Sequence, residues 1–185
     1  IEGGLSRYEF VEHLGGGVSG HVYRAVDRHL SEPDRPALVA IKVLHPHLAY
    51  EQEFISMFLD EARLAARIRH MNVVPTLDVS DSPGDGYFLV MEYIEGNHLG
   101  ALLGRAAKQG ERLPRPFVCR VLIDTLQGLG AAHRLTDENG EPLKLVHRDV
   151  SPHNILVGTE AFSTADPTIN FPRGVTSVIV RAVLP

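Results

Sequence analysis

The sequence predicts an α+β fold in two parts, in which an antiparallel sheet of five strands with one helix precedes a mainly helical part. Short alternating or β-branched runs, separated by turn residues, fill most of the chain before residue 96. One long segment without Gly or Pro interrupts them and has helical periodicity. After Gly96, apolar residues recur at helical spacing instead, so the boundary between the two parts is expected there.

The composition indicates a globular protein with a core and excludes several other classes. The 185 residues are 44% hydrophobic, enough for one domain or for a small domain and part of another. A charged fraction of 22% and a net charge of -5 argue against a nucleic-acid partner. Cys119 is the only cysteine, which suits a reducing compartment, and a cytoplasmic location is expected. The apolar run Val175–Leu184 is too short to span a bilayer, so no membrane segment is expected.

Three strands are predicted before the long helix. Tyr8–Leu14 and His21–Asp27 alternate between apolar and polar residues and are joined by glycines, which indicates a hairpin. Ser31–Pro36 has two prolines and three charges, as a solvated loop would. The β-branched run Ala37–Leu44 follows it as the third strand.

The long helix and two further strands are predicted next. Glu51–His70 should be an amphipathic helix. Its expected apolar stripe consists of Phe54, Met57, Phe58, Leu64, Ala65 and Ile68. Pro75–Ser80 and Tyr87–Ile94 are short apolar runs on either side of the turn-rich segment Asp81–Gly86, so they should form a second hairpin.

The part after Gly96 should contain two helices and a turn. Helical periodicity covers about His98–Gln109 and Pro116–Leu135, and prolines suited to a helix start precede the second. Thr136–Lys144 is polar, and its Asn-Gly pair predicts a turn that joins short extended pieces.

The glycine-rich segment Gly15–Gly20 fits the spacing G-x-G-x-x-G. Residues without Cβ let backbone N–H groups approach phosphate oxygens closely. A dinucleotide-binding fingerprint has the same spacing but leads into a helix, whereas here a strand follows at Val22. Taken alone, the segment could equally be a flexible hairpin without a ligand.

Lys42 is the one charged residue in the apolar run Val39–Leu44. Desolvation of its ammonium group is costly unless an opposite charge or a phosphate compensates. Glu61 lies on the helix stripe that should face the sheet, which makes it a plausible partner. The alternatives are a lysine at a strand edge and a solvated helix glutamate.

The segment His147-Arg148-Asp149 is followed by Asn154 five residues after the aspartate. In-line phosphoryl transfer needs a carboxylate that orients the attacking hydroxyl and accepts its proton, and an oxygen ligand for magnesium nearby. Asp149 and Asn154 could supply both groups. The alternative is an Asx-rich turn without catalytic function.

In this order, the motifs resemble those of the protein kinase family, and of its eukaryotic-like serine/threonine branch in bacteria. They are the glycine loop, V-A-I-K at Lys42, the inward Glu61 and an H-R-D-V-x-x-x-N segment. The resemblance covers about residues 8–157. It implies a protein-kinase-like bilobal fold with a small lobe at 8–95, an incomplete large lobe at 96–157 and a divergent tail at 158–185.

The resemblance assigns catalytic roles to four residues. Asp149 would be the base, Asn154 a magnesium ligand, and Lys42 would hold the α and β phosphates while paired with Glu61. Ser151 stands where many serine/threonine kinases have a lysine that touches the transferring phosphate. A hydroxyl can donate a hydrogen bond there but cannot supply positive charge.

The resemblance also predicts an ATP site. Met91 would be the gatekeeper, the Glu92 carbonyl and Ile94 N–H would bind the adenine edge, and Leu156 would form the pocket floor. The residues expected to bind ATP are Leu14, Gly15, Gly16, Gly17, Gly20, Val22, Ala40, Lys42, Glu61, Met91, Glu92, Ile94 and Leu156. Without its context, the segment that ends at Gly96 would be an ordinary edge strand.

These features predict an ATP- and Mg²⁺-dependent kinase that phosphorylates serine or threonine in a protein substrate. The family's D-F-G motif is missing after the catalytic loop, and Asp166 is a poor substitute because Pro167 follows it. The alternative is therefore a pseudokinase-like module that binds a nucleotide or a partner without catalysis. A small-molecule phosphotransferase is disfavoured by the H-R-D form and by Glu61.

Two further expectations concern surfaces. With an incomplete large lobe, the apolar face of the helix Pro116–Leu135 should be exposed or covered by a partner chain. His45-Pro46-His47 could suggest a metal site, but two histidines without a carboxylate or cysteine cluster favour a loop.

Overall fold

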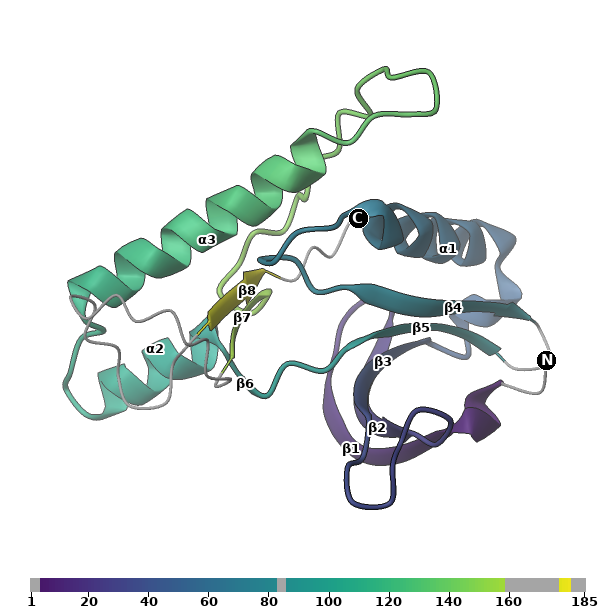
Figure 1. Ribbon diagram of the computed structural model, residues 1–185, viewed down its shortest axis with the longest axis horizontal. Helices are drawn as coiled ribbons and strands as arrows, with labels where there is room; N and C mark the ends of the chain where they lie inside the picture. The colour runs from purple at the N-terminus through teal and green to yellow at the C-terminus, as the bar shows by residue number, and fades with distance from the viewer. Residues whose placement is uncertain (1–3, 83–85, 159–176, 181–185) are drawn as a thin grey trace. The chain divides into compact units, whose positions relative to one another are not determined.

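The computed structural model describes residues 4–82, 86–158 and 177–180 of the chain. It contains two compact units (Figure 1). The first comprises residues 1–67 and 75–93 and contains a sheet and a long helix. The second comprises residues 68–74 and 94–185 and contains two helices and a small sheet.

The first unit is built on a five-stranded antiparallel sheet, as predicted. Its strands, in spatial order, are β1 (Tyr8–Gly16), β2 (Gly20–Asp27), β3 (Leu38–Leu44), β5 (Gly86–Glu92) and β4 (Thr76–Ser82). The sheet is curved (Figure 1), and side chains on one of its faces form a core. That core consists of Tyr8, Ala25, Val39, Ile41, Phe88 and Val90.

The glycine turn is tighter than the sequence suggested. Gly15 and Gly16 belong to β1 and Gly20 to β2, so only residues 17–19 lie between the strands. Gly20 pairs with Leu44 of β3, and a Cβ on Gly20 would lie 2.1 Å from the Val43 carbonyl oxygen. The close approach of two backbones therefore requires glycine at this position.

The helix α1 (Gln52–Arg67) lies along β4 (Figure 1). A short 3₁₀ turn, η2 (Leu48–Tyr50), precedes it. Its buried residues are Ile55, Phe58, Leu59, Ala62 and Ala65. Met57 was expected on the buried stripe, but its side chain is 51% exposed. The prediction was wrong because Phe58 is its neighbour, and a step of one residue turns about 100° around a helix.

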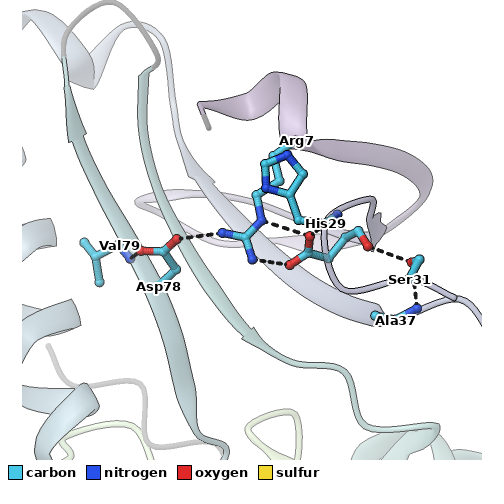
Figure 2. Close-up of polar contacts among 7 residues, drawn as sticks. Arg7, His29, Ser31, Ala37, Asp78 and Val79 are labelled. Carbon is cyan, nitrogen blue, oxygen red and sulfur yellow. Dashed lines mark hydrogen bonds and ion pairs between the residues drawn. The ribbon is translucent and has the colours of Figure 1, made fainter. Parts of the chain in front are cut away.

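A second 3₁₀ turn, η1 (Leu5–Arg7), precedes β1 and is tied to the sheet by charge (Figure 2). The Arg7 guanidinium donates through Nε to Asp27 Oδ1 at 2.9 Å, and its Nη1 lies 3.5 Å from Asp78 Oδ2. Burial alone would raise the pKa of Asp27. The hydrogen bonds from Arg7 and from the His29 backbone N–H, with the positive charge of Arg7, outweigh burial and lower that pKa.

The second unit contains helices α2 (Leu99–Lys108) and α3 (Arg115–His133) close to their predicted positions. It also contains a small antiparallel sheet in the order β6, β7, β8, which the sequence did not predict. These strands are β6 (Gly96–His98), β7 (Ile155–Gly158) and β8 (Ser177–Val180). Strands of three or four residues are too short to show a period of two. These strands are also far apart in the sequence, so no local pattern indicates that they pair.

The core of the second unit lies between its helices and β7. It is formed by Phe117 and Val121 of α3 with Ile155 and Val157 of β7, and Leu99, Leu102 and Leu113 pack against it. The predicted turn after α3 is also present. Thr136 bridges Pro142, and Gly140 has φ +84°, a conformation that suits glycine.

An exposed apolar face on α3 was predicted, and it is confirmed. The exposed large hydrophobic residues on this helix are Val118, Leu122, Ile123 and Leu126, of which Leu126 is 67% exposed. The tail predicted at 158–185 falls mostly outside the described residues. Within the described parts of the chain, no helix combines the length and the apolar character that a membrane span needs.

Candidate functional site

Lys42 and Glu61 form a buried ion pair in the first unit. Lys42 Nζ lies 3.1 Å from Glu61 Oε1, and the two side chains are 6% and 11% exposed. The ammonium group also lies 5.5 Å from the centre of the Phe58 ring. The glutamate and the ring compensate for the desolvation of Lys42, which explains how a lysine is tolerated in the middle of β3. The pairing expected from the sequence is therefore present.

Four of the expected ATP-binding residues share one face of the sheet. Lys42 lies opposite Val22 of β2, and Ala40 lies opposite Met91 of β5. Because side chains alternate along a strand, Val22, Ala40, Lys42 and Met91 project from the same face. Ala40, Lys42 and Met91 are buried. The sheet thus places an ammonium group beside a set of apolar side chains.

The glycine loop lies at the end of this sheet and has an exposed tip. Gly17 N–H donates to the Gly20 carbonyl at 2.9 Å, which closes the turn. The loop is attached to the end of β3, because His45 N–H donates to the Ser19 carbonyl at 3.1 Å. The side chain of Leu14 is exposed at the start of the loop.

The two residues expected to bind adenine through their backbones belong to different units. Glu92 ends β5 in the first unit, and its N–H donates to the Pro75 carbonyl at 3.1 Å. Ile94 belongs to the second unit. The adenine contacts of both residues stay predictions.

The expected catalytic loop is held together by its own side chains. Asn154 Nδ2 donates to Asp149 Oδ2 at 2.7 Å and to the Asp149 carbonyl at 3.0 Å. The Asp149 N–H donates to the carbonyl of the buried His147 at 2.7 Å. Arg148 lies between them with φ +57°, a conformation uncommon for a residue with a Cβ. These contacts place the Asp149 carboxylate beside the Asn154 amide, the pair that the sequence singled out.

Contacts from α2 and β6 support this loop, and they were not expected from the sequence. The Gly100 N–H donates to the Pro152 carbonyl at 3.0 Å. The rings of His98 and His153 lie 5.0 Å apart. His98 also caps α2, because its Nδ1 accepts from Ala101 N–H at 3.1 Å. A polar residue just before a helical run was the available signal for this cap.

The remaining predicted residues lie in or near the catalytic loop, or outside the residues that the structure describes. Ser151 is partly buried, and its carbonyl accepts from Asn154 N–H at 3.0 Å. Leu156 projects from β7 on the face opposite the core residues Ile155 and Val157. Asp166 lies outside the described residues.

The described residues supply only some of the ligands that a magnesium ion needs. No group of three or more His, Cys, Asp or Glu side chains among them is arranged to hold a metal ion. Asp149 and Asn154 offer oxygen atoms, the ligand type that Mg²⁺ prefers, but magnesium needs six ligands and usually keeps several waters.

Comparison with known proteins identifies the family. A family model described as the protein kinase domain matches residues 8–166, rather than ending near residue 157 as the motifs suggested. The serine/threonine-protein kinase PknL of Mycobacterium tuberculosis is 39% identical over 155 residues, which are 84% of this chain and 34% of PknL. The tyrosine-protein kinase MasK of Myxococcus xanthus is 44% identical over 119 residues, which are 64% of this chain and 18% of MasK.

A solved structure agrees with this result at the level of the fold. A mutant form of the PknI kinase domain of M. tuberculosis has a TM-score of 0.65 and 24% sequence identity, and the match covers 96% of this chain and 59% of that one. This chain therefore spans only part of each of these relatives. From residue 8 to residue 166, it belongs to the protein kinase domain family and is related to the serine/threonine protein kinases of bacteria.

Proposed function

We propose that this chain is part of an ATP-dependent protein kinase that transfers the γ-phosphate to a serine or threonine hydroxyl of a protein. The buried pair of Lys42 and Glu61 is the observation that supports it most strongly. A desolvated ammonium group that contacts a carboxylate and lies opposite Val22, two residues after the glycine loop, is suited to bind the phosphates of a nucleotide.

In this proposal, the first unit is the main part of a small lobe at residues 8–95. Lys42 holds the α and β phosphates, and backbone N–H groups of the glycine loop approach the phosphate oxygens. The apolar face that includes Val22, Ala40 and Met91 packs against the adenine ring. Glu92 and Ile94 supply the backbone hydrogen bonds to its edge.

The second unit supplies the catalytic loop of a large lobe, proposed at residues 96–157 and followed by a divergent tail at 158–185. Asp149 orients the substrate hydroxyl and accepts its proton, and Asn154 fixes the Asp149 carboxylate through its amide. When Mg²⁺ is bound, it neutralises phosphate charge. The Asn154 side-chain oxygen would be one of its ligands, and Ser151 would donate a hydrogen bond near the phosphate. The kinase would act in the cytoplasm.

A second candidate is a nucleotide-binding module without catalytic activity. The absence of a D-F-G motif from the sequence and the serine at position 151 favour it. D-F-G supplies the aspartate that holds the magnesium between the β and γ phosphates in protein kinases.

A transfer assay with radiolabelled ATP distinguishes the two candidates. The chain is compared with Lys42→Met and Asp149→Asn variants on a generic protein substrate. Incorporation of label that both substitutions abolish supports the kinase. Thermal stabilisation by ATP that Lys42→Met removes, without incorporation by any variant, supports the module that only binds.

The acceptor hydroxyl needs its own test because one relative carries the name of a tyrosine kinase. Acid hydrolysis of the labelled product, followed by phosphoamino-acid separation, measures the acceptor directly. Phosphoserine or phosphothreonine is expected, and phosphotyrosine alone would contradict this part of the proposal.

A further inference from the structure

Four histidines gather around the glycine loop in the first unit. His13 lies on β1, His21 on β2, and His45 and His47 follow β3. The ring centres of His13 and His21 are 5.1 Å apart, those of His21 and His45 are 4.5 Å apart, and those of His45 and His47 are 5.3 Å apart. We call these four residues the histidine cluster. From the sequence, only His45 and His47 were candidates for a metal site, and a loop was favoured.

His45 attaches the loop to β3 at two points. Its backbone N–H donates to the Ser19 carbonyl at 3.1 Å, and its ring Nε2 lies 2.9 Å from the Gly17 carbonyl oxygen. A carbonyl only accepts, so the ring nitrogen must carry the proton and donate. His45 thereby holds the carbonyls of both Ser19 and Gly17. These contacts restrain the glycine loop, whose N–H groups are proposed to bind phosphates.

His21 packs between this attachment and the loop. A Cβ on Gly16 would lie 2.8 Å from His21 Nδ1, so the ring lies directly over the backbone of Gly16. Since His21 and Val22 are adjacent on β2, the ring lies on the face of the sheet opposite Val22. The histidine cluster therefore contacts the loop from the side away from the proposed nucleotide.

The position of His21 depends on a hydrogen bond that needs one shared proton. His13 Nε2 lies 3.2 Å from His21 Nδ1. One nitrogen must donate and the other must accept, so at least one ring must be neutral. When both rings are cationic, two N–H groups and two positive charges face each other and the contact is lost.

We propose that His45 positions the glycine loop for nucleotide binding and that double protonation of the His13–His21 pair releases it. The inference rests on the proposed role of the loop in holding ATP phosphates. Once His21 turns away from His13, it no longer packs against His45 or covers Gly16. The loop then keeps its hydrogen bonds to His45 but loses the packing of His21 against His45 and Gly16, and the nucleotide binds more weakly.

The polar groups found around the histidine cluster do not offset the positive charge that protonation adds to His13 and His21. His21 of β2 and His47 face it directly, and His13 of β1 and the Tyr23 phenol of β2 lie beside His21. Within the described residues, the ion pairs are formed by arginine or lysine and include none of these four imidazoles. Added protons therefore repel one another across the histidine cluster.

The test measures two quantities at about pH 8 and about pH 6, which bracket the usual range of histidine titration. The first is the Kd of a fluorescent ATP analogue. The second is hydrogen exchange of the backbone amides of residues 15–20, corrected for the intrinsic effect of pH. The wild-type chain is compared with His13→Phe, His45→Ala and His45→Gln, and His29→Gln serves as the control at an exposed histidine outside the histidine cluster.

In the wild-type chain and in His29→Gln, the Kd should rise by about 2- to 10-fold more between pH 8 and pH 6 than in His13→Phe, a range that corresponds to one net hydrogen bond. Loop exchange should rise in parallel. His45→Ala should bind weakly and exchange fast at both pH values. His45→Gln should approach the wild type at pH 8, because its amide can donate to the Gly17 carbonyl.

The inference is overturned if wild type and His13→Phe respond equally to pH in loop exchange, or if His45→Ala leaves loop exchange unchanged. Failure of the proposed function gives a different result. In that case no variant binds the nucleotide at either pH, while hydrogen exchange still reports whether the histidine cluster restrains the loop.

Discussion

Lys42 Nζ lies 3.1 Å from Glu61 Oε1, and the pair joins the middle strand of the larger sheet to α1. Both side chains are nearly excluded from water. Either charge alone at this place would be strongly unfavourable, so the pair matters for folding as well as for nucleotide binding.

The first prediction concerns this pair. Glu61→Ala leaves the Lys42 ammonium buried without its carboxylate, and we expect it to lower the free energy of unfolding by about 3–5 kcal/mol. Urea denaturation measures the change. Glu53→Ala, at an exposed position on the same helix, should change stability by less than about 0.5 kcal/mol. A Lys42→Met/Glu61→Leu double variant should recover most of the loss, and if it does not, desolvation is not the cause.

The second prediction compares two glycines of the loop. Gly20→Ala places a Cβ 2.1 Å from the Val43 carbonyl oxygen, so β2 and β3 must separate locally. We expect the free energy of unfolding to fall by about 1–3 kcal/mol, the usual cost of overpacking. Gly17→Ala meets no atom within 4 Å and should have a much smaller effect on the thermal midpoint. Equal effects of the two substitutions would contradict the register of β2 and β3.

The third prediction concerns the loss of stability at low pH. The pKa of Asp27 is lower in the folded chain than in the unfolded chain, so the unfolded chain takes up the proton first as the pH falls. The stabilisation from Arg7 is thus present above about pH 4 and is lost as the pH falls through the lowered pKa. Urea denaturation between about pH 6 and pH 3 should show a steeper loss for wild type than for Asp27→Asn.

The matched control for the acid experiment is Asp34→Asn, which changes an exposed carboxylate in the loop between β2 and β3. It should leave the acid dependence as in the wild type. An Asp27→Asn variant with the wild-type slope would show that another group causes the acid sensitivity.

The fourth prediction concerns the exposed face of α3. Leu122→Lys and Leu126→Lys should reduce the binding of a hydrophobic dye and the aggregation of the purified chain, because they remove exposed apolar surface. Their thermal midpoints should stay near the wild-type value. Val121→Lys, one residue before Leu122 but fully buried, should prevent folding. Dye binding unchanged by both surface substitutions would place the apolar surface elsewhere.

Much of the fold could be predicted because its signals are local. The hairpin at the glycine loop, the helix near Glu61 and the turn at Gly140 each follow from residues within one short segment. The H-R-D segment and Asn154 lie within eight residues, so their spacing alone suggested that they act together. The pairing of Lys42 with Glu61 was also inferred, since a buried charge needs a partner.

The sequence by itself determined the five strands of the larger sheet, the helices α1, α2 and α3, and the motifs that resemble those of a kinase, because those properties depend on near neighbours. Only the tertiary structure decided that Arg7 meets Asp27, that β6 pairs with β7 and that His13, His21 and His45 surround the glycine loop. Each of these contacts joins separate elements. Their proximity depends on strand register and on chain closure, which no local pattern specifies.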